Sequence, residues 1–437
     1  MRPRLRSRLR RRRPVGPTQG QRAGDDRSCG LRGMDKRPAA TLDAKHVSTN
    51  PLEQIRGARI AHLIESDGPG GAERMLASLA TELQAAGCRN LVIVPANGEG
   101  WLASELAGTG VAVEYLKLDR PVSLSCARWL EAAFRRYGIT IAQSHEFAMA
   151  VYGAWACWRV GIGHVITMHG SHYYRGRLRR RLALRLAVAL SEQVVAVSKQ
   201  LANQMSRDLW VRPARIITIP NGVRFRPAER STLREELRLA VGDPLLVAIG
   251  NLYPVKGHRN LLDALGLLAD RHPRAHVAIA GRGDAADALL ARARELGLAD
   301  RVSLLGLRAD VPGLLMAADI FVLPSRSEGL PLALLEAMFA GCAIVATDVG
   351  EVRSVLADGE AGVVVPPENP VALAGALDRL LSNPTEARRL AAHARRRAQA
   401  EYDVSRMAAR YAALYRVVLD RCSPANARSL DHSTTRG

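Results

Sequence analysis

The chain has 437 residues, and its 62 Lys and Arg against 42 Asp and Glu give a formal charge of +20. This length predicts two or three domains, and a hydrophobic fraction of 48% excludes a disordered or fibrous chain. Aromatic residues make up only 4%, which argues against a surface that stacks nucleic-acid bases, so no nucleic-acid partner is expected.

The cysteines and the apolar runs give no signal for a disulfide framework, a zinc site or a membrane span. The six cysteines form no close pair, which favours a reducing cytosol. No apolar run reaches the roughly 20 residues that a membrane helix needs. The segment 148–168 comes nearest, but it contains Arg159 and His164, so we predict a helix followed by a buried strand. The arginine-rich start lacks the apolar segment of a signal peptide, and we therefore expect a cytoplasmic protein.

Positive charge is concentrated at the N-terminus, where residues 1–13 contain eight arginines. A block of like charge is typically a disordered tail, although it can also bind nucleic acid or anionic lipid. Nothing up to about residue 50 shows helix or strand periodicity, so we predict a disordered basic tail over residues 1–50. Met34 is an alternative translation start within this tail.

From residue 59 onward, short apolar runs alternate with longer stretches of helical periodicity. The apolar runs are continuous rather than alternating, as expected of parallel strands that are buried on both faces. Helices such as 73–86 and 260–269 separate them, and repeated strand–helix–strand units predict doubly wound parallel sheets. The predicted strands are 59–64, 90–94, 111–116, 139–144, 164–168, 193–197 and 215–219 in the first half, and 245–250, 276–280, 302–305, 320–323, 343–346 and 362–365 in the second.

Thirteen strands are too many for one open sheet, so we predict two Rossmann-like domains. The boundary lies in the proline- and charge-containing stretch 225–243, which gives an N-terminal domain over 51–224 and a C-terminal domain over 225–385. Residues 386–420 are expected to form helices that pack back toward the N-terminal domain, and 421–437 to form a disordered tail. Two sheets that face each other leave a cleft at the carboxyl ends of their strands, where ligands bind.

A second basic cluster lies at 173–190, where Arg175–Arg185 contains six arginines and Leu178, Leu182 and Leu186 recur at helical spacing. A basic amphipathic helix of this kind can lie on an anionic membrane surface. The alternative is a surface helix that packs its leucines inward and solvates its arginines. The sequence leaves both interpretations open.

The segment 319–350 combines a strand, a loop and a helix in an arrangement that suits a nucleotide sugar. Pro331 opens the helix, whose N-terminus offers unpaired backbone N–H groups and a positive dipole end to a phosphate. Glu328 precedes the helix and Glu336 lies one to two turns inside it. A carboxylate can accept hydrogen bonds from two vicinal hydroxyls. The plainer alternative is a capped helix with one solvated glutamate.

This segment resembles the signature of glycosyltransferase family 4, whose members are retaining enzymes with the GT-B fold. Its two glutamates are separated by seven residues, as in that signature, and the resemblance covers about residues 57–385. It implies an α/β fold of two Rossmann-like, doubly wound domains that face each other across a cleft. Further stretches that match in the family's order are DGPGGAERMLASLATEL (67–83), TMHG (167–170), VVAVSKQL (194–201), IPNGV (219–223), VKGH (255–258), AGRGD (280–284) and AADIFVLPS (317–325).

The resemblance assigns roles to individual residues of the C-terminal domain. Glu336 holds the donor ribose, Glu328 contacts the transferred sugar and Lys256 neutralises the diphosphate. A fixed cation at Lys256 lowers the barrier, because the leaving diphosphate gains charge as the glycosidic bond breaks. Gly329 and Leu330, at the start of the same helix, belong to the implied donor-binding set.

Asn251 departs from the family pattern, because many members carry an arginine there that binds the diphosphate together with the lysine. Asparagine can donate and accept hydrogen bonds but supplies no charge. Either Lys256 and the helix N-terminus suffice, or a nearby cation such as Arg259 substitutes for the missing arginine. Asn251 is kept in the expected donor-binding set.

The N-terminal domain contributes a glycine loop and two candidate histidines. Gly70 and Gly71 follow the first strand, and the resemblance places them facing the donor, which backbone N–H groups can approach closely there. His169 follows strand 164–168 at its carboxyl end, and its match to the family gives it a catalytic role. His145, at another strand end, is a second candidate on the same ground.

The reaction that the resemblance implies is retaining transfer of a sugar, of the hexosyl type, from a UDP- or GDP-linked donor. The acceptor would be a hydroxyl of a sugar or of a lipid-linked molecule in bacterial polysaccharide or glycolipid biosynthesis. The chain contains no Asp-x-Asp motif, so no metal ion and no cofactor is expected. Peripheral attachment to the inner membrane through Arg175–Arg185 stays open. Another enzyme class on the same fold, such as an epimerase or a phosphorylase, and a degenerate membrane-binding module are the alternatives.

Overall fold

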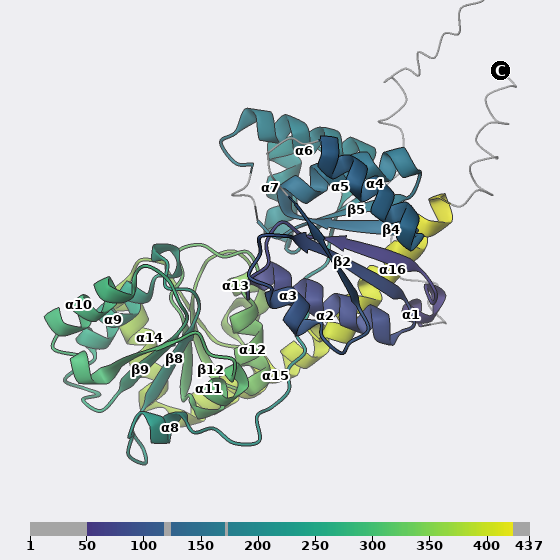
Figure 1. Cartoon of the computed structure of the whole chain (residues 1–437). Coiled ribbons are helices and arrows are strands. Elements are labelled where there is room, and N and C mark those ends of the chain that lie inside the picture. Colours follow the sequence, from purple (N-terminus) through teal and green to yellow (C-terminus); the bar gives the residue numbers. More distant parts are fainter. Residues whose placement is uncertain (1–49, 118–123, 171–173, 423–437) are drawn as a thin grey trace, which may run out of the picture. The chain divides into compact units, whose positions relative to one another are not determined.

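The computed structural model describes residues 50–117, 124–170 and 174–422, and both predicted tails lie almost wholly outside them. Two parallel sheets form the framework (Figure 1). The strands of the first sheet are β1 (Arg59–Leu63), β2 (Arg89–Pro95), β3 (Ala112–Leu116), β4 (Ile141–His145), β5 (Gly163–Met168), β6 (Gln193–Ala196) and β7 (Ile216–Thr218). Those of the second are β8 (Leu245–Ile249), β9 (His276–Ala280), β10 (Val302–Gly306), β11 (Ile320–Leu323), β12 (Ala343–Thr347) and β13 (Val363–Val365).

All thirteen predicted strands are present, and they divide between the two sheets as predicted. The strand orders are β3-β2-β1-β4-β5-β6-β7 and β10-β9-β8-β11-β12-β13, and every pairing is parallel. The order reverses between β1 and β4 in one sheet and between β8 and β11 in the other. The carboxyl ends of strands at such a reversal leave a crevice in which ligands bind. The prediction of two Rossmann-like, doubly wound sheets is confirmed.

Helices cover both faces of each sheet, as buried parallel strands require. In β1, Ile60 packs with α16 and α2, whereas the next residue, Ala61, packs with α4 and α5 on the opposite face. The helices are α1 (Pro51–Gln54), α2 (Gly71–Ala85), α3 (Trp101–Glu105), α4 (Leu124–Tyr137), α5 (Glu146–Val160), α6 (Leu178–Leu190), α7 (Lys199–Leu209), α8 (Leu233–Glu236), α9 (His258–Leu267), α10 (Ala286–Glu295), α11 (Val311–Ala317), α12 (Leu332–Ala340), α13 (Val352–Val355), α14 (Pro370–Ser382), α15 (Pro384–Glu401) and α16 (Val404–Cys422).

The last two helices pack on different sheets. α15 contacts α12 and β12, whereas α16 contacts α1 and α2 beside the first sheet (Figure 1). Between them the chain is hydrogen-bonded to the connection that follows β7. The Val223 N–H donates to the Tyr402 carbonyl at 2.8 Å, and the Val404 N–H donates to the Val223 carbonyl at 3.2 Å. The two segments that join the halves of the protein are therefore bonded to each other.

A buried polar network attaches α16 to the strands of the first sheet. Gln143 on β4 donates to the Thr167 hydroxyl at 2.7 Å and lies 3.1 Å from His62 Nδ1. Two tyrosines of α16 complete the network: the Tyr415 hydroxyl donates to Gln143, and the Tyr411 hydroxyl lies 3.4 Å from that of Thr167. Buried polar groups need such partners, because an unpaired one keeps its full desolvation cost.

Removing the Tyr415 hydroxyl should destabilise the protein. The variant Tyr415→Phe leaves a buried Gln143 oxygen with one partner fewer, which costs about 1–3 kcal/mol of the free energy of unfolding. Denaturant unfolding of both proteins measures the difference. The matched control is Tyr115→Phe, because Tyr115 is 50% exposed and should tolerate the change. Equal stability of the two variants would show that the Tyr415 hydroxyl does not help to hold α16.

Two sequence predictions need correction. α6 begins at Leu178, and Tyr173 lies outside the described residues. The interpretation that its leucines pack inward is wrong, because Leu178, Leu182 and Leu186 are 60%, 52% and 57% exposed. The sequence spacing shows that they share a face but not which face meets the sheet. The buried side instead consists of Leu184, Ala187 and Val188.

The second correction concerns the helix after β11. Pro331 is the N-cap of α12 rather than its first residue, with φ −73° and ψ 120°. Proline has no hydrogen-bonding side chain, so Pro331 does not cap the first N–H groups of the helix.

Candidate active site

One cavity of about 410 Å³ is lined by all nine residues of the expected catalytic and donor-binding set, though not by the further candidates His145 and Arg259. It lies where the carboxyl ends of the central strands of the two sheets come together. A larger cavity, about 770 Å³, is lined by residues around α8 and α15 and contains none of the assigned residues. The first sheet contributes Gly70, Gly71 and His169 to the site cavity, and the second contributes Asn251, Lys256, Glu328, Gly329, Leu330 and Glu336.

Glu328 lies in the loop after β11, with its side chain only 8% exposed. The Lys256 ammonium donates to its Oε1 at 2.8 Å, and the Ser325 hydroxyl donates to the same oxygen at 2.7 Å. Within the described part of the chain, Oε2 accepts no hydrogen bond. A buried carboxylate that is compensated on one oxygen can use the other to accept from a ligand hydroxyl.

Two glycines set the backbone around this ion pair. Gly257 follows Lys256 with φ +66°, and a Cβ there would lie 2.0 Å from the Pro324 carbonyl oxygen. Gly350 has φ +57°, and its Cβ would lie 2.4 Å from the Glu328 carbonyl oxygen. Both positions combine a left-handed conformation with a close backbone approach, so any other residue would displace one of the two loops. The short distance between Lys256 and Glu328 depends on these contacts.

Glu336 lies on α12 and pairs with a residue that the sequence did not assign to the site. Arg74 Nη1, from α2 beside the first sheet, lies 3.5 Å from Glu336 Oε1. The Glu336 side chain is 17% exposed and that of Arg74 34%. Burial raises the pKa of Glu336, and the positive charge of Arg74 opposes this shift only in part. This contact joins the two halves of the protein across the cavity.

His169 and His145 form a stacked pair at the ends of β5 and β4. His145 Nδ1 lies 3.0 Å from His169 Nε2, and the ring centroids are 5.3 Å apart. Burial lowers the pKa of His169 to about 4, and burial together with the neighbouring His169 and His62 holds the pKa of His145 well below its ordinary value. Both rings are therefore neutral at physiological pH, and His169 faces the cavity as a hydrogen-bonding group. His145 does not line the cavity and acts on it only through His169.

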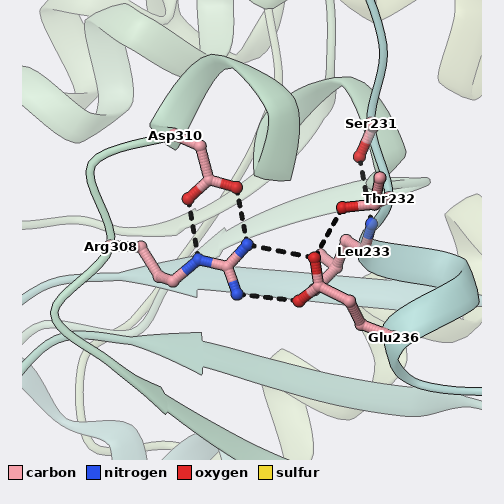
Figure 2. Close-up of polar contacts among 6 residues, drawn as sticks. All are labelled: Ser231, Thr232, Leu233, Glu236, Arg308 and Asp310. Carbon is pink, nitrogen blue, oxygen red and sulfur yellow. Dashed lines mark hydrogen bonds and ion pairs between the residues drawn. The ribbon is translucent and has the colours of Figure 1, made fainter.

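The cations around Asn251 differ from the sequence expectation. Arg259 does not line the site cavity; it lines a separate one of about 220 Å³. Arg308 does line the site cavity, but two carboxylates already engage it (Figure 2). Its guanidinium donates to Asp310 at 2.7 and 2.6 Å and to Glu236 at 2.8 and 3.3 Å.

Sequence reasoning missed three polar residues of the cavity: Arg74, Arg308 and Asn221. Arg74 and Asn221 lie within stretches that match the family, DGPGGAERMLASLATEL and IPNGV, so a signal was present. Asn221 is buried, and its Oδ1 has no hydrogen-bond partner among the described residues. That oxygen is available to a donor group of a ligand. Arg308 follows β10, where no pattern singled it out.

Comparison with known proteins settles the family. Residues 69–225 match the family described as Glycosyltransferase Family 4, and residues 229–397 match Glycosyl transferases group 1. A D-inositol 3-phosphate glycosyltransferase from Thermobispora bispora is 31% identical in an alignment 322 residues long, which covers 67% of this chain and 73% of that protein. The chain belongs to glycosyltransferase family 4. It is therefore a glycosyltransferase, an enzyme that transfers a sugar.

Other relatives of this glycosyltransferase cover smaller parts of the sequence. The alpha-D-kanosaminyltransferase of Streptomyces kanamyceticus is 29% identical over 59% of this chain and 72% of that protein. The match to a D-inositol 3-phosphate glycosyltransferase from Nocardia farcinica, 31% identical over 48% of this chain, spans only 49% of that protein.

Solved structures agree on the fold of this glycosyltransferase. HepE from Anabaena, in complex with UDP and glucose, superposes with a TM-score of 0.72 at 24% identity, covering 81% of this chain and 98% of that one. A glycosyltransferase from Rickettsia africae superposes with a TM-score of 0.72 at 20% identity, covering 83% and 99%. The predicted GT-B arrangement of two Rossmann-like domains is confirmed.

The raised pKa of Glu336 gives a stability prediction for this glycosyltransferase. A carboxyl with a raised pKa in the folded state stabilises the fold below its unfolded pKa and loses that contribution as the pH rises through the folded pKa. The variant Glu336→Gln has no such group, so its Tm relative to the natural protein should increase as the pH rises from acid to neutral. Thermal unfolding at a series of pH values measures this difference.

The exposed Glu229 provides the control, since Glu229→Gln should show no comparable trend. A Tm difference for Glu336→Gln that shrinks with rising pH would mean that the Arg74 ion pair outweighs the cost of burial.

Proposed function

We propose that the protein is a retaining glycosyltransferase that moves a sugar from a nucleotide-sugar donor to an acceptor hydroxyl. The observation that carries this proposal is the placement of Glu328, Lys256 and Glu336 along one cavity. A nucleotide sugar presents sugar hydroxyls, a diphosphate and ribose hydroxyls in that order. A carboxylate, a cation and a second carboxylate are matched to these three groups.

The diphosphate would lie between Lys256 and the N-terminus of α12. Gly329 and Leu330 line the cavity there, and the helix has no side-chain cap. Unpaired N–H groups and the positive end of the helix dipole favour a phosphate at this place. The loop of Gly70 and Gly71 closes the cavity from the opposite side.

In the proposed reaction, the acceptor oxygen attacks the anomeric carbon from the face that the diphosphate leaves. The bond between that carbon and the diphosphate oxygen breaks, and its electron pair stays on the diphosphate. A new carbon–oxygen bond forms to the acceptor, whose proton passes to the departing diphosphate. The products are a glycoside with the configuration of the donor and a free nucleoside diphosphate. Lys256 stabilises the charge that develops on the leaving group, and the scheme assigns no step to a metal ion or a cofactor.

Contacts between the two halves of the protein would help to keep water from hydrolysing the donor. Besides the pair of Arg74 and Glu336, the Gln200 N–H donates to Glu351 Oε1 at 2.8 Å. Arg282 on the second half bonds Glu99 on the first at 2.5 Å. A closed cleft excludes water and strengthens the electrostatic interactions inside it.

We favour a UDP-linked hexose as donor, with a GDP-linked one as the alternative. HepE, the solved neighbour from Anabaena, holds UDP and glucose, and another neighbour is named as a lipopolysaccharide galactosyltransferase, WaaB. The curated relatives are glycosyltransferases named for inositol phosphate and kanosamine. Of these names, that of the lipopolysaccharide galactosyltransferase supports a role in building bacterial polysaccharides or glycolipids.

The experiment that tests this proposal measures nucleotide release with a panel of UDP- and GDP-sugars and of sugar and lipid-linked acceptors. A glycosyltransferase releases the nucleoside diphosphate in step with glycoside and only when the acceptor is present. A product with the donor's anomeric configuration supports retention. A sugar phosphate as product would indicate a phosphorylase, and an isomerised nucleotide sugar an epimerase.

Loss of the Lys256 cation should affect chemistry more than binding. Because the charge it compensates develops in the transition state, Lys256→Ala should lower kcat on the order of 100-fold. The dissociation constant of the donor should change by less than about tenfold. Steady-state kinetics and a donor titration separate the two effects. An unchanged kcat would remove Lys256 from the mechanism.

We also infer that the protein attaches to an anionic membrane surface through the outer side of α5 and α6. Three leucines of α6 are exposed, and α5, which packs against α6, exposes Trp155 by 42% and Trp158 by 55%. Arg175, Arg177 and Arg179 are also exposed. Leucine, tryptophan and arginine together are typical of helices that lie in a membrane interface. No helix in the described ranges is long and apolar enough to cross a bilayer.

The arginines of α6 are not equivalent. Arg181 bonds the Asp208 carbonyl oxygen and lies over the Trp210 ring, 4.6 Å from its centroid. Arg185 lies over the same ring, 5.8 Å from the centroid. These two hold α6 against the end of α7. The arginines that we expect to contact anionic lipid are therefore Arg175, Arg177 and Arg179, which lie at the N-terminal end of α6 and just before it.

Vesicle sedimentation tests the membrane proposal. The protein should pellet with anionic but not with neutral vesicles, and less at physiological than at low salt. Replacing Leu178, Leu182 and Leu186 by serine should reduce pelleting, whereas the equally exposed Leu267→Ser control should not. A chain that starts at Met34 removes the arginines of residues 1–13 from the comparison. Equal pelleting with both lipids, or none, would contradict the proposal.

A further inference from the structure

The site cavity has little uncompensated positive charge for a diphosphate, which carries about two negative charges. Lys256 is already paired with Glu328 at 2.8 Å. Arg308 is bonded to two carboxylates, those of Asp310 and Glu236. Asn251 is neutral. On the side of the second sheet, the cations that line the cavity are therefore matched by carboxylates before any ligand binds.

Arg74 differs from these cations in the bonds that it makes. It lines the cavity from the first half of the protein, and its ion pair with Glu336 is 3.5 Å long. In the described part of the chain its guanidinium takes part in no hydrogen bond, so its five N–H donors are available to a ligand. Arg308, by contrast, uses three nitrogens in four hydrogen bonds.

The position of Arg74 is fixed by the packing of two helix N-termini. It lies in the first turn of α2, where its N–H donates to the Gly70 carbonyl at 3.1 Å. A Cβ at Gly71 would lie 4.0 Å from the Leu332 side chain at the start of α12. Arg74 also lines a neighbouring cavity of about 380 Å³, so its side chain forms part of the wall between the two spaces. The guanidinium is thus held next to the end of α12 where phosphate is expected.

We propose that Arg74 binds the diphosphate of the donor and supplies the charge that Asn251 lacks. This inference rests on the proposed function. Glu336, which Arg74 contacts, is the expected ribose ligand, and the ribose is joined directly to the diphosphate. The guanidinium therefore reaches the phosphates by a small movement that keeps it beside Glu336. Because Arg74 and Glu336 belong to different halves of the protein, donor binding then also draws the halves together.

The test compares nucleotides that carry the diphosphate with nucleosides that lack it. Titrations of UDP, GDP, uridine and guanosine are measured for the natural chain and for Arg74→Gln. A charge-assisted contact with the diphosphate predicts that the variant loses about 10- to 100-fold in affinity for the diphosphate. Its affinity for the matching nucleoside should change by less than about threefold. Equal losses for both ligands, or no loss, would overturn the proposal.

A matched control is available on the same face of the protein. Arg224 is also 34% exposed and pairs with Glu82 of the same helix, but it does not line the site cavity. Arg224→Gln should leave both affinities unchanged. A loss for Arg224→Gln as large as that for Arg74→Gln would show that removal of a cation beside α2, rather than of charge at the diphosphate, is responsible.

A second variant tests whether a positive charge at position 251 can replace the charge of Arg74. Adding Asn251→Arg to Arg74→Gln should restore most of the affinity for the diphosphate, because residue 251 lines the same cavity. Failure to restore it would overturn the claim that both positions face one diphosphate.

If the natural chain binds neither UDP nor GDP, the proposed function itself fails. If it binds one of them and Arg74→Gln binds equally well, only the assignment of Arg74 fails.

Discussion

Two largely buried carboxylates that line one cavity, Glu328 and Glu336, are the constraint on which the rest of the site depends. A buried carboxylate is costly unless a cation or hydrogen-bond donors compensate it. Glu328 is compensated from within its own half of the protein, by Lys256, and Glu336 from the other half, by Arg74. The pair of Lys256 and Glu328 links the loops that follow β8 and β11 in the second sheet. The pair of Arg74 and Glu336 links the two halves of the protein. A nucleotide sugar that enters the cavity meets groups that are already positioned.

The histidine side of the cavity depends on packing behind the first sheet. β4 ends at His145 and β5 is followed by His169, and the same two strands contribute Gln143 and Thr167 to the buried polar network. The tyrosines of α16 complete that network from the C-terminal end of the chain. The last helix thus supports the strands that present His169, and it is joined to the connection between the halves by the hydrogen bonds of Val223.

Much of the fold could be predicted from the sequence, because parallel strands that are buried on both faces consist of continuous runs of apolar residues. Most of the site residues could be predicted, because ligand-binding groups follow the carboxyl ends of parallel strands and because these residues match a family signature. The orientation of α6 could not be predicted, since periodicity shows that Leu178, Leu182 and Leu186 share a face but not where it points. The pair of Arg74 and Glu336 and the pair of His145 and His169 arise from the packing of distant segments. No local pattern encodes such contacts.

The most direct test of this account is a crystal structure of the protein with UDP, or with GDP if only that nucleotide binds. The account predicts a diphosphate within hydrogen-bonding distance of Lys256 and the N-terminus of α12, with the ribose hydroxyls on Glu336. A nucleotide bound instead in the larger cavity around α8 and α15, or bound with its ribose away from Glu336, would contradict it.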